Sequence, residues 1–177
     1  MGLIRHLCII ALVLLYSVSS HADDWIIEDQ DNYITLKKNG EIAHGNNIYF
    51  NFDKHNGCLF NVFFFMYTMQ DNIPPLMEVY EDQAFQVILG GEEIPANLNY
   101  STPFGLGQIA GISIARELPL SEGFIEYNEQ MLQDNLMVMN IPEPHAQYFD
   151  IPEEHWDFTY IGPKLYEAHN ICIAKQI

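Results

Sequence analysis

Basic residues are scarce in this chain. Its 177 residues contain seven lysines and arginines against 24 aspartates and glutamates, which gives a net charge of −17 at pH 7. Nucleic acids and anionic membrane surfaces recruit proteins through basic clusters, so the composition argues strongly against both as partners. The acidic residues are spread along the chain without a long run, which excludes a disordered acidic tail. A surface of this sign attracts a cationic partner or ion.

Long apolar runs are also missing. The run at residues 7–16 has ten residues, well short of the roughly 20 that span a bilayer. It follows Arg5 and precedes small residues, with Ser20 and Ala22 at the positions that a signal peptidase reads. This layout predicts a cleaved secretory signal over residues 1–22, with a membrane anchor or buried helix as the alternative. We therefore expect an exported protein, periplasmic or secreted, with no stable membrane insertion after cleavage and with a single globular domain over residues 23–177.

Cysteine is rare, with three in the whole chain. Removal of the predicted signal takes away Cys8 and leaves Cys58 and Cys172, both in strand-like runs. An exported protein meets oxidising conditions, so an even pair predicts one disulfide, and two buried free thiols are the alternative. The bridge would close a loop of more than 110 residues. In the chain-entropy model such a loop stabilises the fold by about 4–5 kcal/mol.

Motifs for nucleophilic catalysis and phosphate binding are missing too. There is no Gly-x-Ser-x-Gly elbow, and the glycines from Gly105 to Gly111 have neither the spacing nor the lysine of a phosphate loop. Asp29 and Asp31 open a sequence like a calcium loop, but Tyr33 and Ile34 occupy a ligand position and the turn glycine position. We therefore expect no cofactor and favour a protein that is not an enzyme.

Histidine and carboxylate come together in one proline-rich segment. His145 and His155 are the weak candidates for metal ligands, since Asp150, Glu153 and Glu154 lie between them and zinc accepts both imidazole and carboxylate. No two histidines of the processed chain have the i, i+4 spacing of a zinc protease pair. Surface loop residues are the favoured interpretation, and no metal site is predicted.

Strand-forming sequence, in contrast, is plentiful. Residues 33–36 and 48–52 alternate between polar and apolar, and Asn39-Gly40 predicts a two-residue hairpin turn followed at once by a returning strand. Pro95 cannot donate to a ladder, so residues 94–100 are expected at a sheet edge. Further short strands are expected at residues 76–80, 85–89, 109–116, 158–161 and 171–174.

Residues 58–69 are the most apolar stretch of the mature chain. One face would carry Phe60, Val62, Phe64 and Met66, and the other Leu59, Phe63, Phe65 and Tyr67. Such a stretch predicts a central strand, covered on both sides or covered once and exposed as a binding face on the other.

One amphipathic helix is predicted at about residues 122–139. Ser121 can cap its start, and Asn140 and Pro142 can stop it. Its apolar half, which includes Tyr127, most often packs on a sheet. The fold class is therefore mostly β (α+β), an antiparallel β-sandwich or curved sheet with this helix packed on it.

These features favour an exported, acidic, non-enzymatic interaction protein, of the inhibitor or immunity kind, with a basic protein as partner. A metal-dependent or carboxylate-based secreted hydrolase is one alternative. A module that binds a small apolar ligand between sheet and helix is the other. The candidate ligand or partner surface comprises Phe63, Phe65, Tyr67 and Tyr127.

Overall fold

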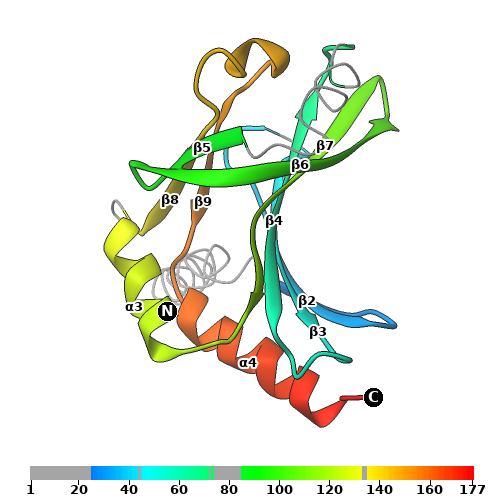
Figure 1. Ribbon diagram of the computed structural model, residues 1–177, viewed down its shortest axis with the longest axis vertical. Helices are drawn as coiled ribbons and strands as arrows, with labels where there is room; N and C mark the ends of the chain where they lie inside the picture. Colours follow the sequence, from blue (N-terminus) through cyan, green and yellow to red (C-terminus); the bar gives the residue numbers. More distant parts are fainter. Residues whose placement is uncertain (1–24, 44, 72, 74–84, 133–134) are drawn as a thin grey trace, which may run out of the picture.

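The computed structural model describes residues 25–177 except 44, 72, 74–84 and 133–134. In this part of the chain nine strands form one antiparallel sheet in the order β1-β2-β3-β4-β7-β6-β5-β8-β9, and the sheet curls into half of a barrel (Figure 1). The elements are β1 (Ile26–Asp29), β2 (Tyr33–Asn39), β3 (Asn47–Asp53), β4 (Phe60–Thr68), β5 (Phe85–Leu89), β6 (Glu92–Phe104), β7 (Gly107–Leu118), α3 (Glu122–Met131), β8 (Leu136–Asn140), the 3₁₀ turn η1 (Ala146–Tyr148), β9 (Glu153–Asp157) and α4 (Ile161–Ala174). The predicted class, antiparallel β with a curved sheet and a packed helix, is confirmed.

The curl is produced at strand β6. Its residues 92–96 pair with β5, whereas residues 97–104 pair with β7. The β5–β8–β9 end therefore stands opposite the inner face of β3 and β4 (Figure 1). Pro95 was predicted to mark an edge strand, and the strand order shows instead that β6 is interior. The proline is tolerated because it pairs only with Gln86 of β5, before the β7 register begins at Asn97.

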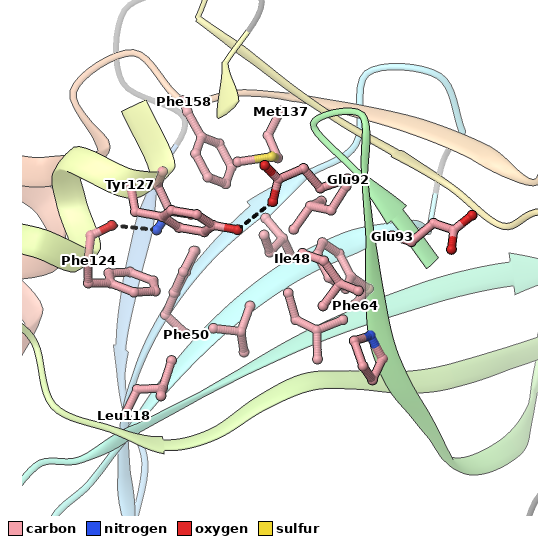
Figure 2. A pocket seen from close by; sticks show the side chains of 16 residues that line it. Ile48, Phe50, Phe64, Glu92, Glu93, Leu118, Phe124, Tyr127, Met137 and Phe158 are labelled. Atoms are coloured by element: carbon pink, nitrogen blue, oxygen red, sulfur yellow. Dashed lines mark hydrogen bonds between the residues drawn. The ribbon is translucent and has the colours of Figure 1, made fainter. Parts of the chain in front are cut away.

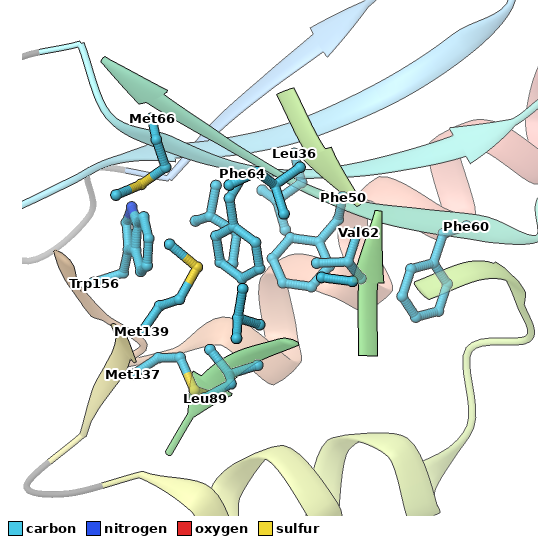
Figure 3. Packing of buried hydrophobic residues seen from close by; sticks show 14 of the residues in the cluster. Leu36, Phe50, Phe60, Val62, Phe64, Met66, Leu89, Met137, Met139 and Trp156 are labelled. Atoms are coloured by element: carbon cyan, nitrogen blue, oxygen red, sulfur yellow. The ribbon is translucent and has the colours of Figure 1, made fainter. Parts of the chain in front are cut away.

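Strand β4 has one fully buried face, and its other face is partly buried, so it is not fully covered on both sides. The fully buried face consists of Phe60, Val62, Phe64 and Met66, none more than 3% exposed. The Phe64 ring lies 5.1 Å from the ring of Trp156 on β9, and the Phe60 ring lies 4.9 Å from that of Phe124 on α3. The core therefore fills the inside of the curl, between the sheet and the elements that follow it (Figure 3).

Helix α3 is shorter than the predicted helix over residues 122–139. Ser121 caps it as expected, because its Oγ accepts the N–H of Phe124 at 3.2 Å. The helix ends at Met131, and residues 136–140 form β8, which pairs with both β5 and β9. The prediction was wrong at this end because short apolar runs fit both periodicities. Met137, on the polar side of the predicted helix, is buried like Met139 in the strand.

The strands predicted at residues 158–161 and 171–174 are not formed: residues 158–160 lie in the turn before helix α4, and residues 161–174 form the helix itself. Its buried side chains include Ile161, Leu165, Ala168 and Cys172, at helical spacings of four, three and four. This face packs on β2 and β3. The error arose because β-branched residues near the end of the chain favour a strand when they are considered without the preceding turns.

The predicted disulfide between Cys58 and Cys172 is present, with Cα atoms 5.9 Å apart and a sequence separation of 114. Neither cysteine lies in a strand: Cys58 closes the turn before β4 with a φ of 57°, and Cys172 lies on α4. The bridge fastens the last helix to the start of the central strand.

The connection from β2 to β3 differs from the predicted two-residue turn at Asn39-Gly40. It runs over residues 40–46, and β3 begins at Asn47. The loop lies against β9, where the N–H of Glu41 donates to the carbonyl oxygen of His155 at 2.9 Å. Glycine is required at position 40, because a Cβ there would lie 2.4 Å from Cδ of Glu154.

The predicted secretory signal at residues 1–22 and the predicted strand at 76–80 lie outside the described residues. Within the described residues, no helix has the length and apolar character needed to cross a bilayer.

Candidate functional site: an apolar cavity inside the curl

An apolar cavity of about 310 Å³ lies between the inner face of the sheet and helix α3 (Figure 2). Its volume falls at the lower end of the range of about 300–1,000 Å³ typical of small-molecule sites. The lining residues are Ile48, Phe50, Val62, Phe64, Leu89, Glu92, Glu93, Ile94, Pro95, Ile114, Leu118, Phe124, Tyr127, Asn128, Met137 and Phe158.

The floor of the cavity is a block of side chains from β3 and β4. The antiparallel register pairs Ile48 with Phe64 and Phe50 with Val62, so all four face the same side of the sheet. Each is at most 3% exposed. Because these strands lie at the centre of the half-barrel, the floor is rigid and apolar.

The rim is formed by the β5–β6 hairpin and helix α3. The hairpin turns at Gly90-Gly91, where φ values of 58° and 88° favour glycine. Glu92 follows the turn, and its carboxylate accepts the hydroxyl hydrogen of Tyr127 at 2.9 Å (Figure 2). This hydrogen bond to Glu92 raises the pKa of Tyr127, with burial as a smaller cause. The bond joins the hairpin to the helix across the cavity.

The lining is mostly apolar. Its polar side chains are Glu92, Glu93, Tyr127 and Asn128, and the remaining lining residues are apolar. Asn128 donates its amide hydrogen to the Phe124 carbonyl oxygen at 2.7 Å, within the same helix. The described lining contains no histidine, cysteine, serine or basic residue to act as nucleophile or base.

The structure divides the predicted ligand or partner surface between two faces. Tyr127 lies at the rim of the cavity. Phe63, Phe65 and Tyr67 alternate with the buried residues of β4 and therefore lie on its outer face, half-buried. The sequence analysis did not find Glu92, for which the only signal is its place directly after a Gly-Gly turn.

The outer face carries an aromatic strip, which we define as Tyr49, Phe63, Phe65, Tyr67, Tyr100 and Phe104. The Phe65 ring lies 4.5 Å from that of Tyr49 and 5.8 Å from that of Tyr100. Burial by these neighbours raises the pKa of both tyrosines. At the far end of the strip the rings of Tyr67 and Phe104 lie 6.3 Å apart, and Phe104 is 54% exposed.

Gly111 on β7 leaves room for the aromatic rings of the strip. Gly111 pairs with Phe65 on one side and Tyr100 on the other. A Cβ at Gly111 would lie 2.6 Å from the Tyr100 ring, so this ring occupies the space that a side chain would take. Three strands thereby carry one continuous apolar surface.

The weak metal candidates do not come together. The Nε2 of His155 lies 3.0 Å from Oε1 of Glu153 on the same strand, and the His145 ring contacts that of Phe85 at 5.7 Å. Asp150 instead fastens the end of β4, where it accepts hydrogen bonds from Thr68 and the Gln70 amide. Among the residues that the structure describes, no three histidine, cysteine or carboxylate side chains are grouped closely enough to hold a metal ion.

Comparison of the chain with protein-family models, with curated proteins and with solved structures found no match in any of the three.

Proposed function

We propose that this protein is an exported, non-enzymatic binding protein that holds a small apolar ligand inside its curled sheet. The cavity of about 310 Å³ between the sheet and α3 carries the proposal. An aromatic and aliphatic lining with a few polar atoms at one side is the usual form of a small-molecule site. The predicted secretory signal and the disulfide support export, since disulfides persist in oxidising compartments.

Burial of apolar surface supplies the affinity in this proposal. A ligand that loses about 200 Å² of apolar surface to the cavity gains about 5 kcal/mol before the cost of association. A gain of this size corresponds to a dissociation constant of about 0.2 mM, and the cost of association makes the observed binding weaker than that. The ligand class is therefore a small hydrocarbon-rich molecule rather than a sugar or nucleotide.

Binding of the neutral fluorescent probe N-phenylnaphthylamine tests the proposal. Ile114 lines the cavity from β7 and is only partly buried, so Ile114→Phe fills cavity space without replacing a fully buried residue. Probe affinity should fall about tenfold or more in I114F. The matched control is Ile171→Phe on α4, which is outside the lining and should bind the probe normally.

Circular dichroism should show the same fold for both variants. Equal probe binding by I114F, I171F and the unaltered protein would place the probe elsewhere and reject the cavity as a ligand site. Failure of the unaltered protein to bind any neutral apolar probe would reject it as well.

A second candidate function is contact with a basic protein, as an inhibitor or immunity protein makes. The aromatic strip favours it, because exposed aromatic side chains are enriched at protein interfaces. The net charge of −17 would speed association with a cationic partner. Capture of a basic protein from the secreted fraction should succeed at low salt, weaken at high salt and fail for Phe104→Ser. The control Ile42→Ser changes another exposed apolar residue and should leave capture intact.

A further inference from the structure

The polar atoms of the cavity are concentrated at one place. Glu92 extends its carboxylate from the hairpin toward Tyr127 of α3, with the Phe158 ring close by (Figure 2). Most of the remaining lining is apolar and includes the floor from β3 and β4. A ligand that fills the floor must therefore present its other end to a carboxylate flanked by aromatic rings.

Glu92 has no cationic partner in the described part of the chain. Among the described residues, no lysine, arginine or histidine forms an ion pair with it, and its hydrogen bond comes from the neutral Tyr127 hydroxyl. That bond uses Oε2 and holds the carboxylate in place, while Oε1 has no protein donor in the described part of the chain. Glu92 and Tyr127 are both exposed at the rim of the cavity, so the carboxylate also faces solvent. Without a counter-charge among the described residues, it is free to accept a hydrogen bond from a cation.

Glu93 provides an internal comparison. It also contributes to the lining, but its carboxylate points away from Tyr127 and the cavity, to the other side of the hairpin (Figure 2). The alternation of side chains along β6 explains the difference, because successive residues of a strand face opposite sides. Two neighbouring acids of equal charge thus differ in whether they reach the site.

We infer that the cavity selects an amphiphilic cation, with a hydrocarbon body on the floor and an ammonium group bound by Glu92. This inference rests on the proposed function and specifies in addition that the ligand is positively charged. A charge-assisted hydrogen bond to the ammonium group would be strengthened by the Tyr127 and Phe158 rings, whose faces attract cations. An anionic head group at the same place would face an unpaired carboxylate and be rejected.

Three ligands of equal chain length test the inference: octylammonium, octanol and octanoate, each titrated by calorimetry and by displacement of N-phenylnaphthylamine. We expect octylammonium to bind about tenfold more tightly than octanol, and octanoate to bind more weakly than either. In Glu92→Gln the amide oxygen still accepts the Tyr127 hydrogen bond, so only the charge is removed. This variant should bind octylammonium and octanol equally. Glu93→Gln, with the same change in net charge, should keep the preference.

The outcomes separate the two levels of the proposal. Equal binding of octylammonium and octanol by the unaltered protein would overturn the charge selection while leaving the apolar site intact. Equal loss of preference in E92Q and E93Q would also overturn it, because net charge alone would then be responsible. Binding of none of the three ligands, with no displacement of the probe, would overturn both the inference and the proposed function. A preference lost in E92Q alone supports the inference.

Discussion

Glu154 shows how much one buried carboxylate contributes to this fold. It is fully buried on β9 and accepts the N–H groups of Ile42 at 2.7 Å and Ala43 at 2.9 Å. The side-chain amide of Asn46 donates at 2.8 Å, and the N–H of His155 at 2.9 Å. These donors replace the water that the charge loses on burial. The residue therefore holds the β2–β3 loop against the last strand and helps to keep the sheet curled.

Replacement of Glu154 by glutamine should lower the free energy of unfolding by about 2–3 kcal/mol, since hydrogen bonds to a charged group are lost and an NH₂ group faces other donors. Urea denaturation measures the change. Glu153→Gln is the matched control, because that partly exposed carboxylate pairs only with the His155 ring and should cost less than about 1 kcal/mol. Equal losses in the two variants would contradict this role of Glu154.

Asp29 joins the first strand to the C-terminus. It accepts hydrogen bonds from Lys175 and, at 2.6 Å, from the buried Lys54. Both bonds lower the pKa of Asp29 below its ordinary value of 3.8, and the bond from Lys175 has the larger effect. Because the folded-state pKa is lower than the unfolded one, the stabilisation is complete above pH 3.8 and is lost as the pH falls through the folded-state pKa.

We therefore expect Asp29→Asn to be less stable than the unaltered protein at neutral pH, with a difference that shrinks as the pH falls below 3.8. Urea denaturation over a pH series checks this. Glu143→Gln is the control, because this exposed carboxylate forms no ion pair among the described residues, and its stability difference should not follow the same pH course. If the stability difference between D29N and the unaltered protein instead grew as the pH fell, the predicted direction of the pH dependence would be wrong.

At the scale of elements, helix α4 depends on two attachments. One is its buried face on β2 and β3, and the other is the disulfide from Cys172 to Cys58. The bridge spans 114 residues, so it restricts the unfolded chain strongly. Without it the helix would be held by its apolar face and by the contact of Lys175 with Asp29 just after its last turn.

The double variant Cys58→Ser/Cys172→Ser should lower the free energy of unfolding by about 3–5 kcal/mol. Dithiothreitol should lower the free energy of unfolding of the unaltered protein to nearly that of the double variant. It should leave the free energy of unfolding of the variant unchanged. Urea denaturation with thiol counting distinguishes the cases. Complete reduction without a loss of stability would show that the bridge does not restrict the unfolded chain as the loop length implies.

At the scale of the whole molecule, the charge of −17 works against compactness. Mutual repulsion of carboxylates is screened by salt, while the few ion pairs of the described residues are too scarce to reverse the effect. The melting temperature should therefore rise by roughly 3–6 °C between about 10 mM and about 300 mM sodium chloride. Chloride is used because sulfate stabilises proteins by exclusion from their surface. A melting temperature that falls with added salt would contradict net repulsion.

Local pattern was sufficient for some of this fold. The alternation of β4 separates Phe64, which is buried, from Phe65, which is not, because successive strand residues face opposite sides whatever they pair with. Ser121 was identified as a cap because its hydroxyl acts on the next turn of the same helix. The acidity is a property of composition. The disulfide was predicted because removal of Cys8 with the predicted signal leaves one pair of cysteines.

Tertiary structure decided what depends on segments far apart in the chain. Residues 136–140 became a strand because β5 and β9 satisfy their backbone groups, and neither partner is evident from local periodicity. The structural role of Glu154 depends on three donors that lie 108–112 residues away, besides the N–H of the adjacent His155. Tyr127 was separated from Phe65 by the thickness of the sheet and brought to Glu92, 35 residues away, across the cavity. A sequence determines which side chains share a face, whereas a cavity and its charge arise only when distant faces meet.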